Sequence, residues 1–288
     1  SMGAFLLSLY RAPRNIFTVS EKAEREGEYL EKGGEKPADW FYLMRAYPLD
    51  TIPYLAVERA RKQAQELKNE AKIKGEPWVW TPGGPYNIGG RITAIASDTS
   101  DPQLIYLGAA DGGVFKSTDG GNHWTPIFDY MPSLSIGALT IEPGNPQVLY
   151  VGTGEANSSG DSYDGDGLYV TRDGGNTWEH LGLSETKHIG RIIIRPDDHD
   201  VIFVAAMGNL FSTNPERGVY RSTDGGETWE KVLFISDSTG CIDIAINPSH
   251  PDTVFAAMWE RIRRPSERRV GGLSLIHISE PTRLGMIS

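Results

Sequence analysis

The sequence predicts an all-β protein, an incomplete β-propeller of about 3.5 four-stranded blades with an N-terminal helical arm. The first observation is an octapeptide that occurs three times, at residues 117–124, 171–178 and 222–229. Its copies begin about 50 residues apart, which is the size of one propeller blade. Short apolar runs and turn residues alternate between the copies, as they do in antiparallel sheets.

The octapeptide, which in its first copy reads Ser117-Thr118-Asp119-Gly120-Gly121-Asn122-His123-Trp124, is expected to form a turn. Its aspartate can accept backbone N–H groups of the same turn, and its glycine pair supplies positive φ angles. The tryptophan begins the outgoing strand and is expected to cover a neighbouring sheet. We therefore interpret the three aspartates of the motif as structural and not catalytic; they are Asp119, Asp173 and Asp224.

Residues 1–77 are expected to form a helical and irregular arm. A capping box at Thr18 predicts a helix that ends near Lys32, and Pro53 predicts the first turn of a second helix that ends near Lys74. Aromatic side chains between residues 40 and 48 are expected to pin the arm to the main domain. The alternative is a helix that binds a partner.

Residues 78–270 contain three complete units and the first half of a fourth. Each unit begins with glycine and an apolar run, and the four starts are Gly90, Gly137, Gly190 and Gly240. Because propellers usually need more blades to close, we expect the N-terminal part of a longer propeller, whose missing C-terminal blades would be partners of this chain. Residues 271–288 carry no repeat signal and are expected to be a non-native tail.

Composition excludes several functional classes. The 28 basic and 38 acidic residues give a net charge of −10, which argues against nucleic acid as the main partner. The single cysteine, Cys241, excludes an intramolecular disulfide and is expected to lie in the core. No apolar run is long enough to span a membrane. No metal-ligand spacing or phosphate loop occurs, so we expect no metal and no cofactor.

Aligning the four units suggests a ligand site near the propeller axis. A carboxylate follows the second strand in three of them, at Asp111, Glu155 and Glu260. Basic residues at the start of the first strand share the same face and can bind a polar or anionic ligand. We predict that Asp111 and Glu155 are catalytic and that the ligand is bound by Arg91, Asn157, His188, Arg191, Glu260 and Arg261. The alternative is that these charges form ion pairs between blades.

The loop 157–167 is the longest insertion within a blade, and we expect it to be solvated. Its Asp164-x-Asp166-Gly167 sequence has part of a calcium-loop pattern but lacks the closing glutamate.

The octapeptide resembles the Asp box, or BNR repeat, of sialidases. The stretches 89–95, 152–157 and 258–261 are similar to those of large secreted bacterial BNR proteins, and Ala110-Asp111-Gly112-Gly113 is similar to a catalytic stretch of endo-xyloglucanases. This resemblance implies a glycosyl-hydrolase-like propeller outside the cell or in the periplasm, acting on a polysaccharide or glycoconjugate. The resemblance to sortilin implies the alternative, a non-catalytic propeller that binds a peptide or protein.

The two hypotheses differ in what they require of the carboxylates. A glycosidase needs two of them flanking the bond, about 5–5.5 Å apart for retention or about 6.5–9.5 Å for inversion. Asp111 and Glu155 are the best pair in this sequence. In the xyloglucanase-like case, the second carboxylate would come from a blade outside this chain. This chain would then be inactive alone.

Overall fold

A computed structural model describes residues 37–48, 89–98, 100–263, 268–271 and 276–279, together with several positions between 56 and 70. The chain divides into two compact units, residues 1–37 and 38–288, and the strands that the structure describes belong to the second. The helix predicted between Thr18 and Lys32 lies outside the described residues. The described positions between 56 and 70 are helical, as predicted.

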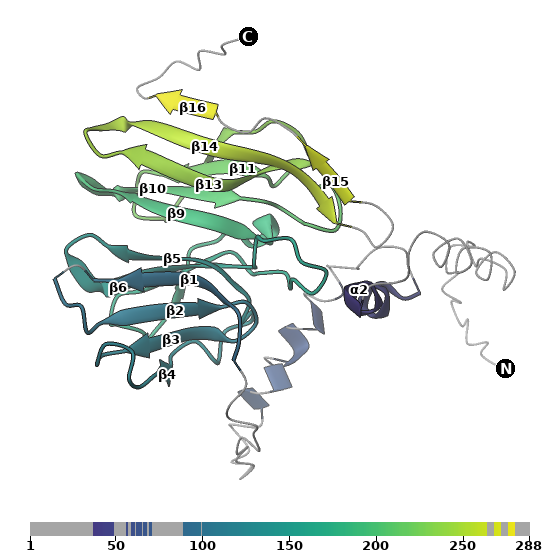
Figure 1. The fold of residues 1–288 in the computed structure, drawn as a ribbon, viewed down its shortest axis with the longest axis horizontal. Helices are drawn as coiled ribbons and strands as arrows, with labels where there is room; N and C mark the ends of the chain where they lie inside the picture. Colours follow the sequence, from purple (N-terminus) through teal and green to yellow (C-terminus); the bar gives the residue numbers. More distant parts are fainter. Residues whose placement is uncertain are drawn as a thin grey trace, which may run out of the picture. The chain divides into compact units, whose positions relative to one another are not determined.

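Among the described residues, the strands form four antiparallel sheets of four strands each (Figure 1). The first contains β1 (Ile92–Ser97), β2 (Ile105–Ala109), β3 (Gly113–Ser117) and β4 (Thr125–Pro126). The second contains β5 (Ile136–Glu142), β6 (Asn145–Thr153), β7 (Leu168–Thr171) and β8 (Glu179–His180). The third contains β9 (Ile189–Arg195), β10 (Asp198–Ala206), β11 (Gly218–Ser222) and β12 (Glu230–Leu233). The fourth contains β13 (Thr239–Asn247), β14 (His250–Arg263), β15 (Arg268–Gly271) and β16 (Ile276–Ser279).

The sheets are the blades of an incomplete propeller, which confirms the predicted fold class. Strands β1, β5, β9 and β13 contact one another in chain order, so the first strand of each blade faces the first strand of the next (Figure 1). In the fourth sheet, β15 and β16 both pair with the same edge of β14. Two expectations stay predictions: the domain boundaries at residues 77 and 270, and the non-native origin of residues 271–288.

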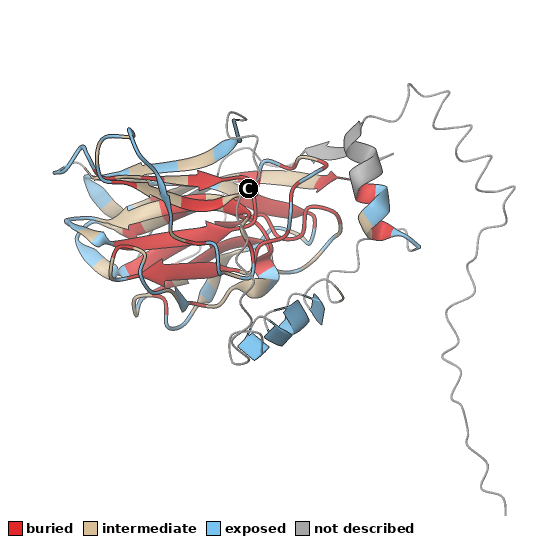
Figure 2. Cartoon of the chain, turned by 90° about the horizontal axis from the view of Figure 1, so that it is seen from below, coloured by how far each residue is buried: buried red, intermediate tan, exposed pale blue. Residues whose placement is uncertain are grey.

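The hydrophobic cores lie between adjacent blades, where Figure 2 shows the buried strands. The first core packs Tyr106 and Val114 against Leu149 of the second blade. The blades approach so closely that a Cβ on Gly137 would lie 1.9 Å from the carbonyl oxygen of Ile189. Cys241 is buried in the core between the third and fourth blades, as predicted.

The octapeptide turns have the predicted hydrogen bonds. The Asp173 carboxylate accepts the Thr177 backbone N–H at 2.9 Å and its hydroxyl at 2.6 Å. In the first copy, the His123 ring takes the place of that hydroxyl, with Nδ1 2.6 Å from Asp119 Oδ2. Trp178 Nε1 donates to the Ile127 carbonyl of the preceding blade at 2.9 Å. Trp229 Nε1 donates likewise to the Leu181 carbonyl at 2.7 Å, so the turns of the second and third blades each bind the blade before them.

Helix α2 (Pro37–Ala46) is an element that the sequence analysis missed. Proline at its first position and Pro48 just after its end bracket a short helix, a signal that was present in the sequence. Its Tyr42 and Ala46 are buried in a cluster with Ala156, Met207, Leu210 and Phe211. The expected pinning by this region is thus confirmed for Tyr42, whereas Tyr47 is exposed.

Candidate functional site

Backbone hydrogen bonds connect the start of the first strand to the end of the second strand in each blade. We call this end of the blade the hub end. At this point Arg91, Ser135, His188 and Ser238 accept, through their carbonyl oxygens, the N–H groups of Ala110, Gly154, Met207 and Arg261. The next residues, Asp111, Glu155 and Gly208, are therefore structurally equivalent in the first three blades. This confirms that part of the repeat alignment and shows that Arg91 corresponds to His188.

The positions given to Arg191 and Glu260 by that alignment are wrong. Arg191 lies inside β9 opposite Ala205, and its exposed side chain pairs with Asp243 at 3.6 Å. Glu260 lies within β14 and accepts a hydrogen bond from the Ser238 hydroxyl at 3.3 Å. The alignment matched Gly90 with Gly137 and Gly190, but the first-blade residue in the place of those glycines is Thr93, so Arg91 was compared with Arg191 instead of His188. In the second strands the alignment matched Phe255 with Phe203, whereas the residue equivalent to Asp111 and Glu155 is Ile262, two residues after Glu260.

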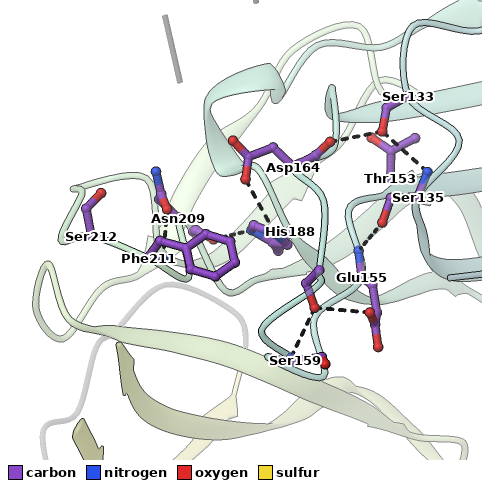
Figure 3. A network of polar contacts seen from close by, with 12 residues as sticks. Ser133, Ser135, Thr153, Glu155, Ser159, Asp164, His188, Asn209, Phe211 and Ser212 are labelled. Carbon is purple, nitrogen blue, oxygen red and sulfur yellow. Dashed lines mark hydrogen bonds and ion pairs between the residues drawn. The ribbon is translucent and has the colours of Figure 1, made fainter. Parts of the chain in front are cut away.

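Glu155 is fully buried at the hub end of the second blade (Figure 3). Its backbone N–H donates to Ser135 Oγ, and its Oε2 accepts from the Ser162 hydroxyl, each at 3.0 Å. Its Oε1 forms an ion pair with Arg91 Nη1, which joins the first blade to the second. Since Arg91 keeps 42% of its side-chain surface exposed, the pair connects a buried carboxylate to a cation at the surface.

Asp111 lies on a pocket of about 350 Å³ beside this ion pair. The pocket is lined by Asp111, Pro132, Ser133, Leu134, Ser135 and Tyr163. Asp111 is exposed, but partial desolvation raises its pKa and the Asp161 carboxylate raises it further, while Arg91 and Arg45 oppose the shift. A carboxyl group with a raised pKa, beside an aromatic ring and a guanidinium, is suited to proton donation to a ligand.

The loop 157–167 is not the solvated loop that we expected. Ser158, Ser162 and Asp164 are buried, and side chains from distant parts of the chain hold the loop. Arg261 Nε donates to Ser158 Oγ at 2.8 Å, and the Ser133 hydroxyl donates to the Asp164 carbonyl at 3.0 Å.

Three side chains of this loop are exposed, and one of them, Tyr163, lines the pocket. The three are Asn157, Asp161 and Tyr163. Asp161 lies 4.0 Å from Arg91 Nη2, and a hydrogen bond from Ser159 lowers its pKa. No metal-binding group of three or more acidic, histidine or cysteine side chains occurs among the residues that the structure describes.

His188 supports the loop from inside the protein and does not reach solvent. Its Nδ1 donates to the Gly208 carbonyl at 2.9 Å, and burial lowers its pKa. Its Nε2 has no hydrogen-bond partner and lies 3.7 Å from Asp164 Oδ1 (Figure 3). His188 therefore stands behind the pocket wall, not on its surface.

Arg217 is a buried residue that the sequence analysis missed. It is fully buried, and burial lowers its pKa to about 10. It donates to four backbone carbonyls, which belong to Asn209, Ser212, Ser238 and Arg261. It thus connects the hub loops of the third and fourth blades, and no sequence pattern distinguished it from a surface arginine.

Comparison with known proteins gives the following. No protein-family model matches the chain. A xyloglucanase from Paenibacillus sp is 26% identical over 170 residues, which cover 54% of this chain and 16% of that protein. An ancestral GH74 enzyme is similar over 60% of this chain and 23% of its own, with 21% identity and a TM-score of 0.47. The Niastella koreensis GH74 enzyme is similar over 65% and 30%, with 22% identity and a TM-score of 0.47.

The chain therefore spans only 16% of the length of its curated relative. Within the described part of the chain, none of the helices has the length and apolar character needed to cross a membrane.

Proposed function

We propose that this chain is part of a glycosyl-hydrolase-like propeller that acts on or binds an extracellular glycan, with its site in the Asp111 pocket. The observation that carries the proposal is a pocket lined by Tyr163 and by Asp111, an exposed carboxyl group of raised pKa on which the Arg91 guanidinium acts electrostatically. Similarity to a xyloglucanase supports a polysaccharide as the ligand. Such a substrate implies an extracellular or periplasmic location.

In this proposal Asp111 is the general acid and Glu155 the second carboxylate. Partial desolvation favours the protonated form of Asp111, as a proton donor requires. Both oxygens of Glu155 bind protein groups, so Glu155 can act only after a ligand draws Arg91 away from it. In a xyloglucanase-like arrangement the second carboxylate would instead come from another blade, and Glu155 would orient Arg91.

The residues predicted to bind the ligand would have different roles. Arg91 and Asn157 are exposed and would hydrogen-bond to ligand hydroxyls. Arg261 and His188 would support the loop from behind. Since Arg191 and Glu260 lie inside strands, they would contact only a ligand that extends beyond the pocket.

The second candidate is a non-catalytic, sortilin-like propeller with the Asp-box turns as its scaffold, which binds a peptide or protein. The burial of Glu155 favours it, because a binding protein needs no pair of accessible carboxylates. In that case Arg91 and Asp111 would pair with charged groups of the ligand.

The test is hydrolysis of xyloglucan, sialosides and aryl glycosides by the wild type, Asp111→Asn and Glu155→Gln. We expect Asp111→Asn to lower kcat by about 10²-fold or more, as loss of a general acid does. Asp173→Asn, in an octapeptide turn, is the matched control and should retain kcat. If no glycan is hydrolysed, the protein is titrated with xyloglucan oligosaccharides. Binding that Asp111→Asn abolishes would support a glycan-binding site, and no binding would favour the peptide-binding alternative.

A further inference from the structure

Helix α2 brings a cation to the loop beside the pocket. The Arg45 guanidinium donates from Nη1 to the Ser162 carbonyl at 3.1 Å and from Nη2 to the Gly160 carbonyl at 3.0 Å. These carbonyls belong to a segment more than one hundred residues away in the sequence. We call residues 157–164 the wall segment, because its Tyr163 lines the pocket. It also carries Asp161, whose carboxylate interacts electrostatically with Asp111.

The guanidinium is also held between two aromatic rings. Its Cζ lies 5.2 Å from the centre of the Tyr163 ring and 5.2 Å from that of Phe211. On the same helix, Tyr42 packs on Phe211 with their ring centres 5.6 Å apart. Helix packing, stacking and hydrogen bonding therefore all restrict Arg45 to one place.

The two hydrogen bonds go to carbonyls two residues apart in the wall segment, so they fix its backbone. The side chains of Asp161 and Tyr163 follow directly after these two bonded residues. Asp161 is exposed and interacts with Asp111 electrostatically, while Tyr163 forms part of the pocket lining. A displaced wall segment would move both side chains away from Asp111.

We propose that Arg45 is a positioning residue of the pocket, which uses its two-pronged guanidinium to hold the wall segment so that Asp161 and Tyr163 stand beside Asp111. Helix α2 is then part of the site and not only a packing element. The proposal takes the pocket to be the functional site described above, but its test does not depend on any glycan. Failure of one proposal is therefore distinguishable from failure of the other.

The test compares Arg45→Lys and Arg45→Met with the wild type. Lysine keeps the charge but has no planar fork to bind two carbonyls at once, whereas methionine keeps only the apolar contact. Hydrogen exchange is measured at Ser159 and Ser162, whose amides are bonded within the wall segment. We expect exchange there to be at least about tenfold faster in both variants, as loss of about 1.4 kcal/mol of local stability would give.

Two controls separate positioning from general destabilisation. Arg59→Met removes an exposed arginine of the N-terminal region and should leave exchange in the wall segment unchanged. The Gly175 amide, bonded to Thr171 Oγ1 in an octapeptide turn, should exchange at the wild-type rate in the Arg45 variants.

A second measurement follows the titration of the Asp111 carboxyl carbon by NMR in Arg45→Lys. With the charge at position 45 kept and Asp161 no longer held nearby, the midpoint should fall toward the value of an ordinary aspartate. Wild-type exchange and an unchanged midpoint in Arg45→Lys would overturn the proposal, since they would show that charge alone suffices. Unchanged exchange in Arg45→Met would overturn it as well, and if that variant does not fold, Arg45→Lys carries the test.

Discussion

Replacing Arg217 with methionine should destabilise the protein strongly. The guanidinium is fully buried and donates to four carbonyls of the third and fourth blades. Methionine fills similar space but leaves these carbonyls without their donors. A buried carbonyl left without its donor typically costs about 1–3 kcal/mol, and for the four together we take about 3–5 kcal/mol. We expect a loss of this size in the free energy of unfolding, although relief of the buried charge offsets part of it.

Urea denaturation followed by tryptophan fluorescence measures the loss directly, and the melting temperature should fall by roughly 6–20 °C. Arg172→Met is the matched control. Arg172 is 55% exposed and lies 3.8 Å from Glu179, and such surface pairs contribute about 0–1 kcal/mol. If Arg217→Met and Arg172→Met lost equally little stability, the interpretation of Arg217 as the connection between hub loops would be wrong.

Two further predictions concern the contacts between blades and the turns. Gly137→Ala should lower the free energy of unfolding by at least about 2 kcal/mol, because its Cβ would clash with the Ile189 carbonyl. Gly90 has open space around it, so Gly90→Ala should change the stability little. Equal denaturation midpoints for the two variants would contradict this prediction. Hydrogen bonds from His123 and Thr228 hold the pKa of Asp119 and Asp224 at about 2, below the unfolded value of about 3.9. Their stabilisation is therefore complete above about pH 4 and is lost as pH falls toward 2, so the double Asn variant should lose less stability between pH 5 and pH 2 than the wild type.

The blades were predictable because their signals are local. The aspartate and glycines of each octapeptide form their turn with groups a few residues away, so the motif alone indicates the turn and its spacing indicates the blade. Helix α2 was missed because only ten residues form it and contacts with Ala156 and Phe211, far along the chain, stabilise it.

The site was predictable only in part. Asp111 and Glu155 occupy equivalent positions, as the alignment of the second strands predicted. Arg191 was misplaced because Gly90 was matched with Gly190, whereas Thr93 is the residue of the first blade that takes the place of Gly190. That mismatch is three residues, and an odd shift moves a side chain to the other face of a sheet. Arg217 and Arg45 gave no signal, because what distinguishes them is the set of distant carbonyls that they bind.

The most direct test of the proposed site is a crystal structure of this chain with a xyloglucan oligosaccharide. We expect a sugar ring within hydrogen-bond distance of the Asp111 carboxyl group, in contact with Tyr163 in the pocket. A sugar bound at the octapeptide turns, at the opposite end of the blades, would contradict it.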